Sequence, residues 1–149
     1  MVDSVEIEIR EIMYGSLEYH QEIRLRSKIL REPLGLQFRP DELAGENKDI
    51  HLGAFSGTTL LGCLLLSPQA NNTMRVRQVA VDANTQGRGI GRKLVEYSEQ
   101  KASSLGFTEL YLKARLTAVP FYLKLGYSFY DEPFEEVTIP HRKMRKTIH

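Results

Sequence analysis

The residues best suited to chemistry form a glycine turn, Gln86–Gly91, which reads Gln-Gly-Arg-Gly-Ile-Gly. Glycines at alternate positions let the backbone come close to a ligand, because no Cβ stands in the way. A segment with helical spacing follows, and the first N–H groups of a helix have no partners within the helix. Such groups favour a negative charge at the start of the helix. The turn is therefore predicted to bind an anion.

Two common anion-binding turns match this stretch poorly. The phosphate loop of nucleotide hydrolases has Gly-Lys-Ser/Thr after a glycine and four residues, whereas counting from Gly87 gives Arg92, Lys93 and Leu94. A dinucleotide-binding turn has its third glycine one position later than Gly91 and an acidic residue after the next strand, and neither feature fits cleanly. A nucleotide phosphate is thus the less favoured ligand.

The turn lies between a predicted strand and a predicted helix. In Met74–Val81 the apolar residues alternate and then run together, which is typical of a strand. From Ile90 onward apolar residues recur at helical spacing, and charged residues lie mostly on the other face. These apolar positions are Ile90, Leu94, Val95, Ala102 and Leu105.

Two motifs resemble the GNAT superfamily of acetyl-CoA-dependent N-acetyltransferases. Gln86–Gly91 has the form Gln-x-x-Gly-x-Gly of that family's pyrophosphate-binding motif, and it follows Val79–Asp82 as expected. Ala118–Tyr127 resembles the family's later helix and the strand after it. The specific motifs fall within residues 74–130, and the N-terminal half matches only in the order of its elements.

The resemblance implies a site for acetyl-CoA as a co-substrate, and no metal. The pantetheine arm would pair with the strand edge at Val79–Val81, where an N–H near Val79 would contact the thioester oxygen. The pyrophosphate would rest on amides of Gly87 to Arg92. For the Arg88 and Arg92 side chains, ordinary surface positions are an equal alternative. The expected coenzyme-binding residues are Val79, Ala80, Val81, Gln86, Gly87, Arg88, Gly89, Ile90, Gly91 and Arg92.

The resemblance also suggests catalytic groups. Tyr122 matches the tyrosine that protonates the leaving thiolate in many family members, and an ordinary pKa of about 10 keeps a tyrosine protonated at neutral pH. A packed aromatic residue is the alternative. Candidates for the general base are His51, Glu136 and His141, each on a predicted strand or its end. We prefer His141, which follows Pro140 near the end of the last predicted strand, with a chain of waters as the alternative.

The acceptor site of this family usually lies among the first helices, their loop and the last hairpin. Arginines with apolar neighbours occur in this part of the chain or on the central strand: Arg24, Arg26, Arg31, Arg39 and Arg77. We expect Arg31 and Arg77 to bind substrate, which would suit an amine that carries a carboxylate or phosphate. Ordinary surface charge is the alternative. Since no acidic cluster suited to a polyamine or aminoglycoside stands out, polycationic acceptors are disfavoured.

The whole chain has 149 residues and a formal net charge of +1. This length predicts one domain over residues 1–149, and the charge gives no reason to expect nucleic acid as a partner.

Cys63, the sole cysteine, excludes an internal disulfide and agrees with a reducing cytoplasm. It lies in the apolar run Leu60–Leu66, which is too short to cross a membrane and predicts a buried, inert thiol. The N-terminus lacks the pattern of a signal peptide.

The remaining elements complete the predicted fold. Strands are expected at Val5–Arg10, Ile50–Phe55, Leu60–Ser67, Phe107–Ala114, Tyr127–Tyr130 and Glu135–Met144, and helices at Leu17–Leu30, Asp41–Ala44 and Thr117–Leu125. This order predicts an α/β (α+β) domain with a mixed sheet. It agrees with the GNAT fold, which implies about six to seven strands flanked by about four helices.

The chain is thus expected to transfer an acetyl group directly from acetyl-CoA to a primary amine of a small molecule or peptide, in a ternary complex. Alternatives with the same fold use a protein lysine, an N-terminal amine or another acyl-CoA. A catalytically silent CoA-binding sensor is the non-enzyme alternative. We expect a cytoplasmic protein with neither nucleic acid nor membrane as a partner, and a homodimer stays open.

Overall fold

The structure is a computed structural model that describes residues 6–136 and 139–148. Its strands are β1 (Glu8–Ile12), β2 (Ile50–Ser56), β3 (Thr59–Pro68), β4 (Thr73–Val81), β5 (Glu109–Arg115), β6 (Ser128–Phe129), β7 (Phe134–Glu136) and β8 (Ile139–Thr147). Its α-helices are α1 (Leu17–Arg26), α2 (Pro40–Ala44), α3 (Ile90–Ser104) and α4 (Val119–Lys124). Within these ranges no helix is both long and apolar enough to cross a membrane.

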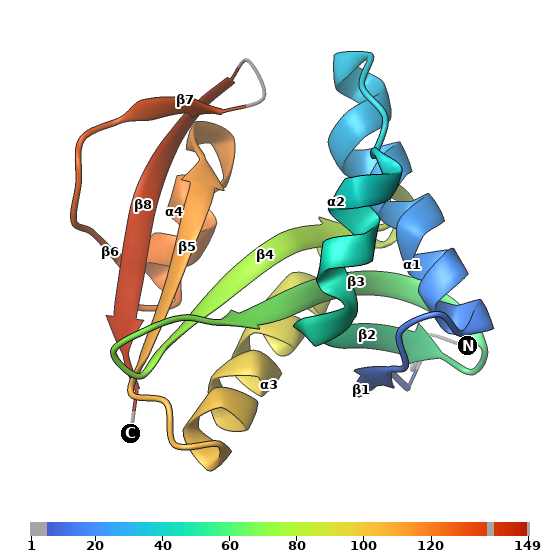
Figure 1. The fold of residues 1–149 in the computed structure, drawn as a ribbon, viewed down its shortest axis with the longest axis horizontal. Coiled ribbons are helices and arrows are strands. Elements are labelled where there is room, and N and C mark those ends of the chain that lie inside the picture. Colours follow the sequence, from blue (N-terminus) through green and yellow to red (C-terminus); the bar gives the residue numbers. More distant parts are fainter. Residues whose placement is uncertain (1–5, 137–138, 149) are drawn as a thin grey trace.

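The strands form one mixed sheet that opens in the middle. Their order is β1-β2-β3-β4-β5-β8-β6, and β7 pairs with β8. The central neighbours β4 and β5 are parallel, and they pair only between Thr73–Val76 and Glu109–Leu112. Beyond these residues the two strands diverge (Figure 1). The sheet therefore has two arms, β1–β4 and β5–β8, that meet at one end and separate at the other.

Helices cover both faces of the β1–β4 arm, and each covered face buries an apolar cluster. On one face Leu64 and Leu66 pack in a cluster with Leu94 of α3. On the other face Cys63 packs in a cluster with Leu25 of α1. Neighbouring residues of a strand point to opposite faces, so a strand covered on both sides is apolar throughout. This arrangement explains the unbroken apolar run in β3.

The predicted fold class is confirmed, with eight strands and four α-helices in the described residues. The predicted helix Leu17–Leu30 is α-helical only to Arg26 and continues as a π-helical turn, Ser27–Arg31. The predicted single strand Glu135–Met144 is divided in the structure, because its described residues belong to two strands, β7 and β8, which pair antiparallel. Side chains alternate in the same way before and after a reversal of direction, so the pattern did not reveal it. Val5, the start of the first predicted strand, lies outside the described residues.

Candidate active site

The divergence of the arms leaves one edge of β4 without a strand partner. Within the described ranges, β4 beyond Val76 pairs only with β3. A bulge interrupts this pairing between Cys63 and Leu65, and Gln78 of β4 has a φ of 56°. This left-handed conformation is costly for a residue with a Cβ, and such strain concentrates at functional sites. The open edge of β4 is therefore the first place to look for a binding site.

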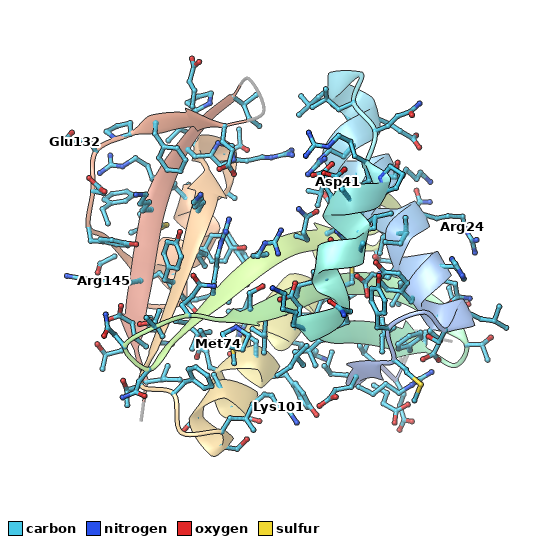
Figure 2. All side chains as sticks on the ribbon, in the orientation of Figure 1. Arg24, Asp41, Met74, Lys101, Glu132 and Arg145 are labelled. Carbon is cyan, nitrogen blue, oxygen red and sulfur yellow. The ribbon has the colours of Figure 1, made fainter. Side chains whose placement is uncertain are left out.

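Two cavities meet at this edge. The first, of about 610 Å³, is lined by the glycine turn, Val81 and Phe121, and we call it the turn cavity. The second, of about 440 Å³, is lined by β4, β5 and residues near the first helices, and we call it the arm cavity. Figure 2 shows side chains of both arms pointing into the space between them. Val79, Ala118 and Tyr122 line both cavities, so molecules in the two cavities would meet there.

The glycine turn has the backbone conformation that its sequence requires. Gly87 and Gly89 have φ values of 89° and 76°, which glycine adopts at little cost. Gly89 caps α3, and neither a side-chain cap nor an acidic residue in the first turn competes for the free N–H groups. A Cβ on Gly91 would lie 3.3 Å from Cζ of Phe121, so glycine allows this close approach. The helix start therefore favours an anion in the turn cavity.

The free edge of β4 adds backbone groups to the turn cavity. The N–H of Asp82 donates to the Leu61 carbonyl of β3, at 2.8 Å. Because N–H groups point to alternate sides along a strand, those of Val79 and Val81 point to the free edge. Nε2 of Gln86 donates to the Val81 carbonyl at 3.3 Å, which ties the turn to this edge. The structure thus brings the predicted strand edge and the predicted turn together.

Four of the predicted coenzyme residues present little side chain to the turn cavity. Ala80 is buried in the cluster under α1, and Ile90 is buried in the cluster under α3. Arg88 is exposed and lines neither cavity. Arg92 lines the turn cavity, but its side chain pairs with Glu96 at 3.1 Å on the surface.

Tyr122 lies between the two cavities and is 6% exposed. Its ring packs edge-on against Phe121 and Tyr127, with centroids 4.9 Å and 5.7 Å away. Burial raises the pKa of the Tyr122 hydroxyl well above its ordinary value. The hydroxyl therefore stays protonated at neutral pH, so it can donate a proton or a hydrogen bond to either cavity.

His141 lines the arm cavity and is 4% exposed. It lies at the start of β8 rather than near the end of the last strand as predicted, because β8 begins at Ile139. Nδ1 of His141 is 2.9 Å from the Ile139 carbonyl oxygen. Since a carbonyl only accepts, Nδ1 carries the hydrogen and Nε2 of the neutral ring has the lone pair. A stacked Phe134, with centroids 5.6 Å apart, holds the ring in place.

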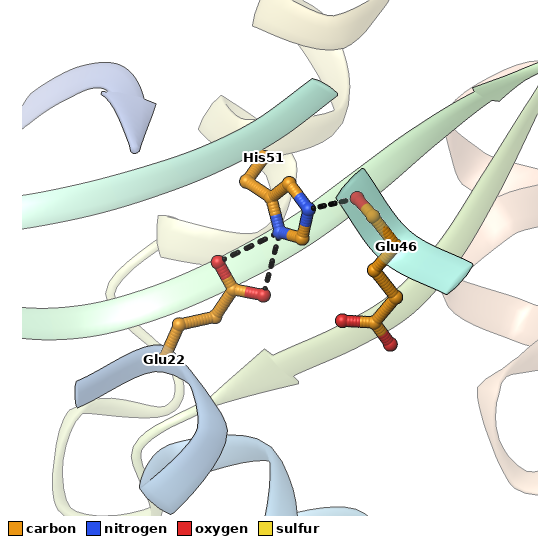
Figure 3. A group of neighbouring side chains, drawn as sticks. All are labelled: Glu22, Glu46 and His51. Atoms are coloured by element: carbon orange, nitrogen blue, oxygen red, sulfur yellow. Dashed lines mark hydrogen bonds and ion pairs between the residues drawn. The ribbon is translucent and has the colours of Figure 1, made fainter. Parts of the chain in front are cut away.

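The two other base candidates have competing partners. Glu136 lines the arm cavity but pairs with Lys113 at 3.2 Å. His51 lines neither cavity, and its Nδ1 and Nε2 are each 2.9 Å from an oxygen, of the Glu22 carboxylate and of the Glu46 carbonyl (Figure 3). Because both oxygens accept, both ring nitrogens donate and the ring is protonated. His51 therefore has no lone pair for a substrate proton and has a structural role.

We expect His51 to make the protein less stable as the pH rises above about 6.5. Burial opposes the charge of His51, but the hydrogen bond and charge of Glu22 raise its pKa above the ordinary value. A raised pKa stabilises the fold fully below the unfolded-state pKa of about 6.5, and this contribution is lost as the pH rises through the folded-state pKa. The slope for one proton is at most about 1.4 kcal/mol per pH unit. Urea unfolding of the wild type and His51→Gln over a pH series measures it, and equal slopes in both proteins would contradict the assignment.

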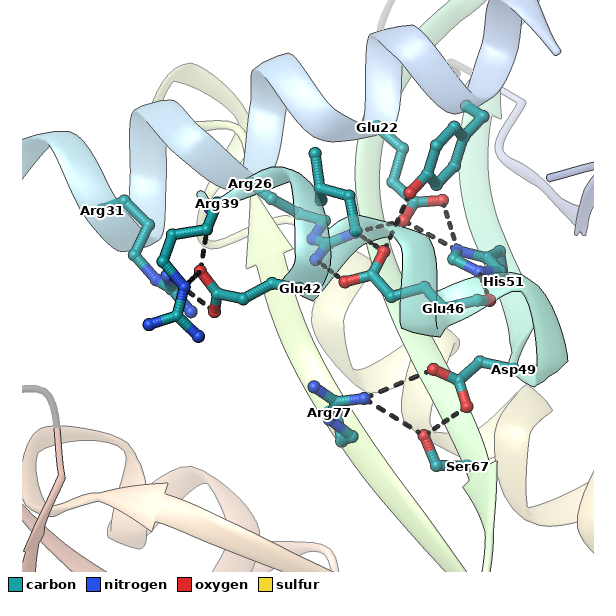
Figure 4. A network of polar contacts seen from close by, with 12 residues as sticks. Glu22, Arg26, Arg31, Arg39, Glu42, Glu46, Asp49, His51, Ser67 and Arg77 are labelled. Atoms are coloured by element: carbon teal, nitrogen blue, oxygen red, sulfur yellow. Dashed lines mark hydrogen bonds and ion pairs between the residues drawn. The ribbon is translucent and has the colours of Figure 1, made fainter. Parts of the chain in front are cut away.

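The arm cavity is lined by more basic than acidic side chains. The basic residues are Arg31, Arg75, Arg77, Lys113 and Arg115, and the acidic residues are Glu42 and Glu136. Both predicted substrate-binding arginines are among them, but each already has an acidic partner (Figure 4). Arg31 is 3.4 Å from Glu42, and Arg77 is 3.3 Å from Asp49. Their charges are therefore partly neutralised within the protein.

The residues of the arm cavity that were not among the predicted site residues include Arg75, Gln78 and Arg115. Arg75 could have been found, because strand alternation places it on the same face as Arg77. Gln78 could not, since the bulge that turns it depends on the pairing of β4 with β3. Arg115 is the last residue of β5, and no pattern in the sequence around it marks it as a site residue.

Two cavities that meet beside one buried proton donor suit a transfer between two bound molecules, and the glycine turn suits a donor with phosphate groups. The fold and the site thus define a two-substrate transferase. A family model described as an acetyltransferase (GNAT) domain matches residues 33–148, and the chain belongs to this family. It is an acyltransferase, and the family uses acetyl-CoA.

Individual relatives agree with this family. An uncharacterized N-acetyltransferase of Bacillus subtilis (strain 168), YitI, is 29% identical over 148 residues, which cover 93% of this chain and 96% of YitI. A solved Lactobacillus plantarum protein assigned as an N-acetyltransferase has a TM-score of 0.85 and 24% identity, covering 96% and 99% of the two chains. An aminoglycoside 6'-N-acetyltransferase solved with coenzyme A has a TM-score of 0.77 and 20% identity, covering 95% and 97%. At these identities the comparison shows that this chain has the same fold as the two solved structures.

Proposed function

We propose that the protein transfers an acetyl group from acetyl-CoA to a primary amine of a small molecule or peptide. The meeting of the two cavities at Val79 and Tyr122 is the observation that supports this most directly. The turn cavity would hold acetyl-CoA, with the pyrophosphate on the first amides of α3 and the pantetheine along the free edge of β4. The residues present fit such a ligand, because they offer free N–H groups to both its phosphates and its amides. The arm cavity would hold the amine.

Each of the protein's groups then has one task in the transfer. Nε2 of His141, or a water in its place, takes the proton that the ammonium loses. The N–H of Val79 stabilises the oxyanion that develops as the nitrogen–carbon bond forms. As the carbon–sulfur bond breaks, the Tyr122 hydroxyl gives its proton to the departing thiolate, and the second proton that the nitrogen loses on becoming an amide restores the hydroxyl. Adjacent cavities hold both substrates in place, which lowers the entropic part of the barrier.

Cys63 supports direct transfer rather than an acetyl-cysteine intermediate. The residue is fully buried in the core and lines neither cavity. Burial raises the pKa of its thiol far above the ordinary value. A thiol that stays protonated is a poor nucleophile, so the amine itself attacks the thioester in a ternary complex.

A thermal-shift titration with acetyl-CoA, CoA and ATP, followed by an assay of thiol release with a panel of amines, tests the proposed function. Ligands that bind the native state raise its melting temperature by mass action. We expect a shift with acetyl-CoA and CoA but not with ATP, and thiol release that depends on an amine. No shift with either coenzyme would overturn the function. Coenzyme binding without thiol release would favour a sensor, and modification of added proteins alone would favour a protein acceptor.

We expect Gly89→Ala to weaken acetyl-CoA binding about tenfold, because forcing a residue with a Cβ into the left-handed region costs about 1–2 kcal/mol. Relief of that strain would move the amides at the start of α3. Gly57→Ala is a matched control, since Gly57 has a φ of 60° and, like Gly89, has open space around its Cβ position. It lies in the hairpin turn between β2 and β3, away from both cavities. Isothermal titration measures both affinities, and equal losses would remove the turn from the coenzyme site.

A further inference from the structure

The arm cavity contains two buried polar atoms that lack hydrogen-bond partners within the described part of the chain. They are Nε of Arg75, a donor, and Oε1 of Gln78, an acceptor. Buried polar groups in proteins are nearly always paired, because an unpaired one loses its hydrogen bonds to water without replacing them. Both residues line the arm cavity and lie on β4 near the point where it separates from β5.

Among the described residues, Arg75 differs from the other cations around the cavity because its side chain pairs with neither a carboxylate nor a carbonyl. Arg31, Arg77 and Lys113 each pair with a carboxylate. Arg115 donates to the Leu30 carbonyl at 2.9 Å. The Arg75 guanidinium lies over the Tyr111 ring, 5.7 Å from its centroid.

Burial lowers the pKa of Arg75, although an arginine stays charged at neutral pH. An aromatic ring face attracts a cation but compensates it less than a carboxylate does. Arg75 thus carries a positive charge on a half-buried side chain that no ion pair or hydrogen bond of the described residues compensates, and an anionic ligand would compensate it.

The position of Arg75 sets the shape of that ligand. Arg75 lies opposite Tyr111 at the end where β4 and β5 are still paired, whereas Val79 lies at the open end, where the cavities meet. Four residue steps of a regular strand span roughly 13 Å, and the bulge at Gln78 makes the distance between these two Cα atoms shorter than that. An anion near Arg75 and a reacting amine near Val79 would therefore belong to opposite ends of one molecule. Gln78 lies between these two positions.

We infer that the acceptor is an amine that also carries an anionic group, a carboxylate or phosphate, at the end remote from the amine. Arg75 binds the anion, and Oε1 of Gln78 accepts a hydrogen bond from the amine. This inference rests on the proposed function, because it assigns the substrate class of the same site. It also moves the anion-binding role from Arg31 and Arg77 to an arginine that no carboxylate occupies.

Matched acceptors test the inference. One set consists of ω-amino carboxylic acids of increasing chain length, the second of alkylamines of the same lengths, and the third of aminoalkyl phosphates. We expect the wild type to acetylate at least one anionic set with a kcat/KM about tenfold or more above that of the alkylamines, since a hydrogen bond to a charged group contributes about 1.5–3 kcal/mol. The better anionic set identifies the group.

Two variants locate the effect. Arg75→Met should raise KM for the anionic acceptor about tenfold or more and leave KM for the alkylamine and for acetyl-CoA unchanged. Gln78→Met should raise KM for both acceptors, because both present the amine. Arg145→Met is the matched control. Arg145 lies on β8, its guanidinium also lies over a tyrosine ring, that of Tyr130, and it does not line the arm cavity (Figure 2). Melting temperatures and the shift with CoA show that each variant is folded.

The outcomes separate this inference from the function on which it rests. Acetylation of anionic amines and alkylamines with equal kcat/KM would overturn the inference and leave the acetyltransferase function standing. A preference for anionic amines that survives in Arg75→Met would overturn the role of Arg75. An enzyme that binds the coenzyme but acetylates no amine would overturn the function and the inference together.

Discussion

Replacing Tyr122 with phenylalanine is expected to lower kcat about 100-fold and to leave the affinity for acetyl-CoA unchanged. General acid catalysis contributes about 10²–10⁴-fold, and a thiolate is a fair leaving group, so the lower end of that range applies. The hydroxyl is the one polar group of Tyr122's side chain, and the ring packing against Phe121 and Tyr127 would persist. Steady-state kinetics and isothermal titration measure the two quantities.

Tyr127→Phe is the matched control for this experiment. Tyr127 is also a buried tyrosine, but its hydroxyl donates to Glu99 at 2.9 Å and it lines neither cavity. Loss of that hydrogen bond should cost about 1 kcal/mol of stability and little turnover. Equal kcat in the wild type and Tyr122→Phe would remove the tyrosine from the mechanism. Equal losses in both variants would indicate a packing effect rather than proton donation.

The parts of the fold and site that depend on local sequence could be predicted. The glycines marked the turn in the sequence, and in the structure Gly87 and Gly89 have left-handed φ values. The strand Met74–Val81 and the helix that starts at Ile90 follow from periodicity, and they differ little from β4 and α3. Each of these features involves residues close together in the chain, so the sequence alone contains the information.

The features that remained hidden depend on partners far apart in the chain. His51 matched a base candidate in sequence, but pairing with Glu22, 29 residues earlier, gives it a structural role. Arg77 looked available for substrate until β4 brought it to Asp49. The strain at Gln78 arises from the register of β3 against β4. Polar side chains acquire their roles from tertiary neighbours, which periodicity does not identify.

Replacing Arg26 with methionine is expected to lower the free energy of unfolding by about 3–5 kcal/mol, the cost of breaking a buried ion pair from one side. The Arg26 guanidinium is fully buried and donates three hydrogen bonds to carboxylates (Figure 4). One goes to Glu22 at 2.8 Å, and two go to Glu46 at 2.8 Å and 2.5 Å. Without it, protonated His51 alone balances two buried carboxylates. Those carboxylates and His51 also lie close enough to suit a metal ion, but Arg26 already supplies the cation.

Urea unfolding measures this loss, and Arg24→Met on the exposed face of the same helix is the matched control, with an expected change within about 0.5 kcal/mol. The double variant Arg26→Met/Glu46→Gln should recover part of the loss, because it removes one of the two carboxylates left without a cation. A cost below about 1 kcal/mol, or no recovery in the double variant, would mean that packing rather than charge balance fixes α1 against the sheet.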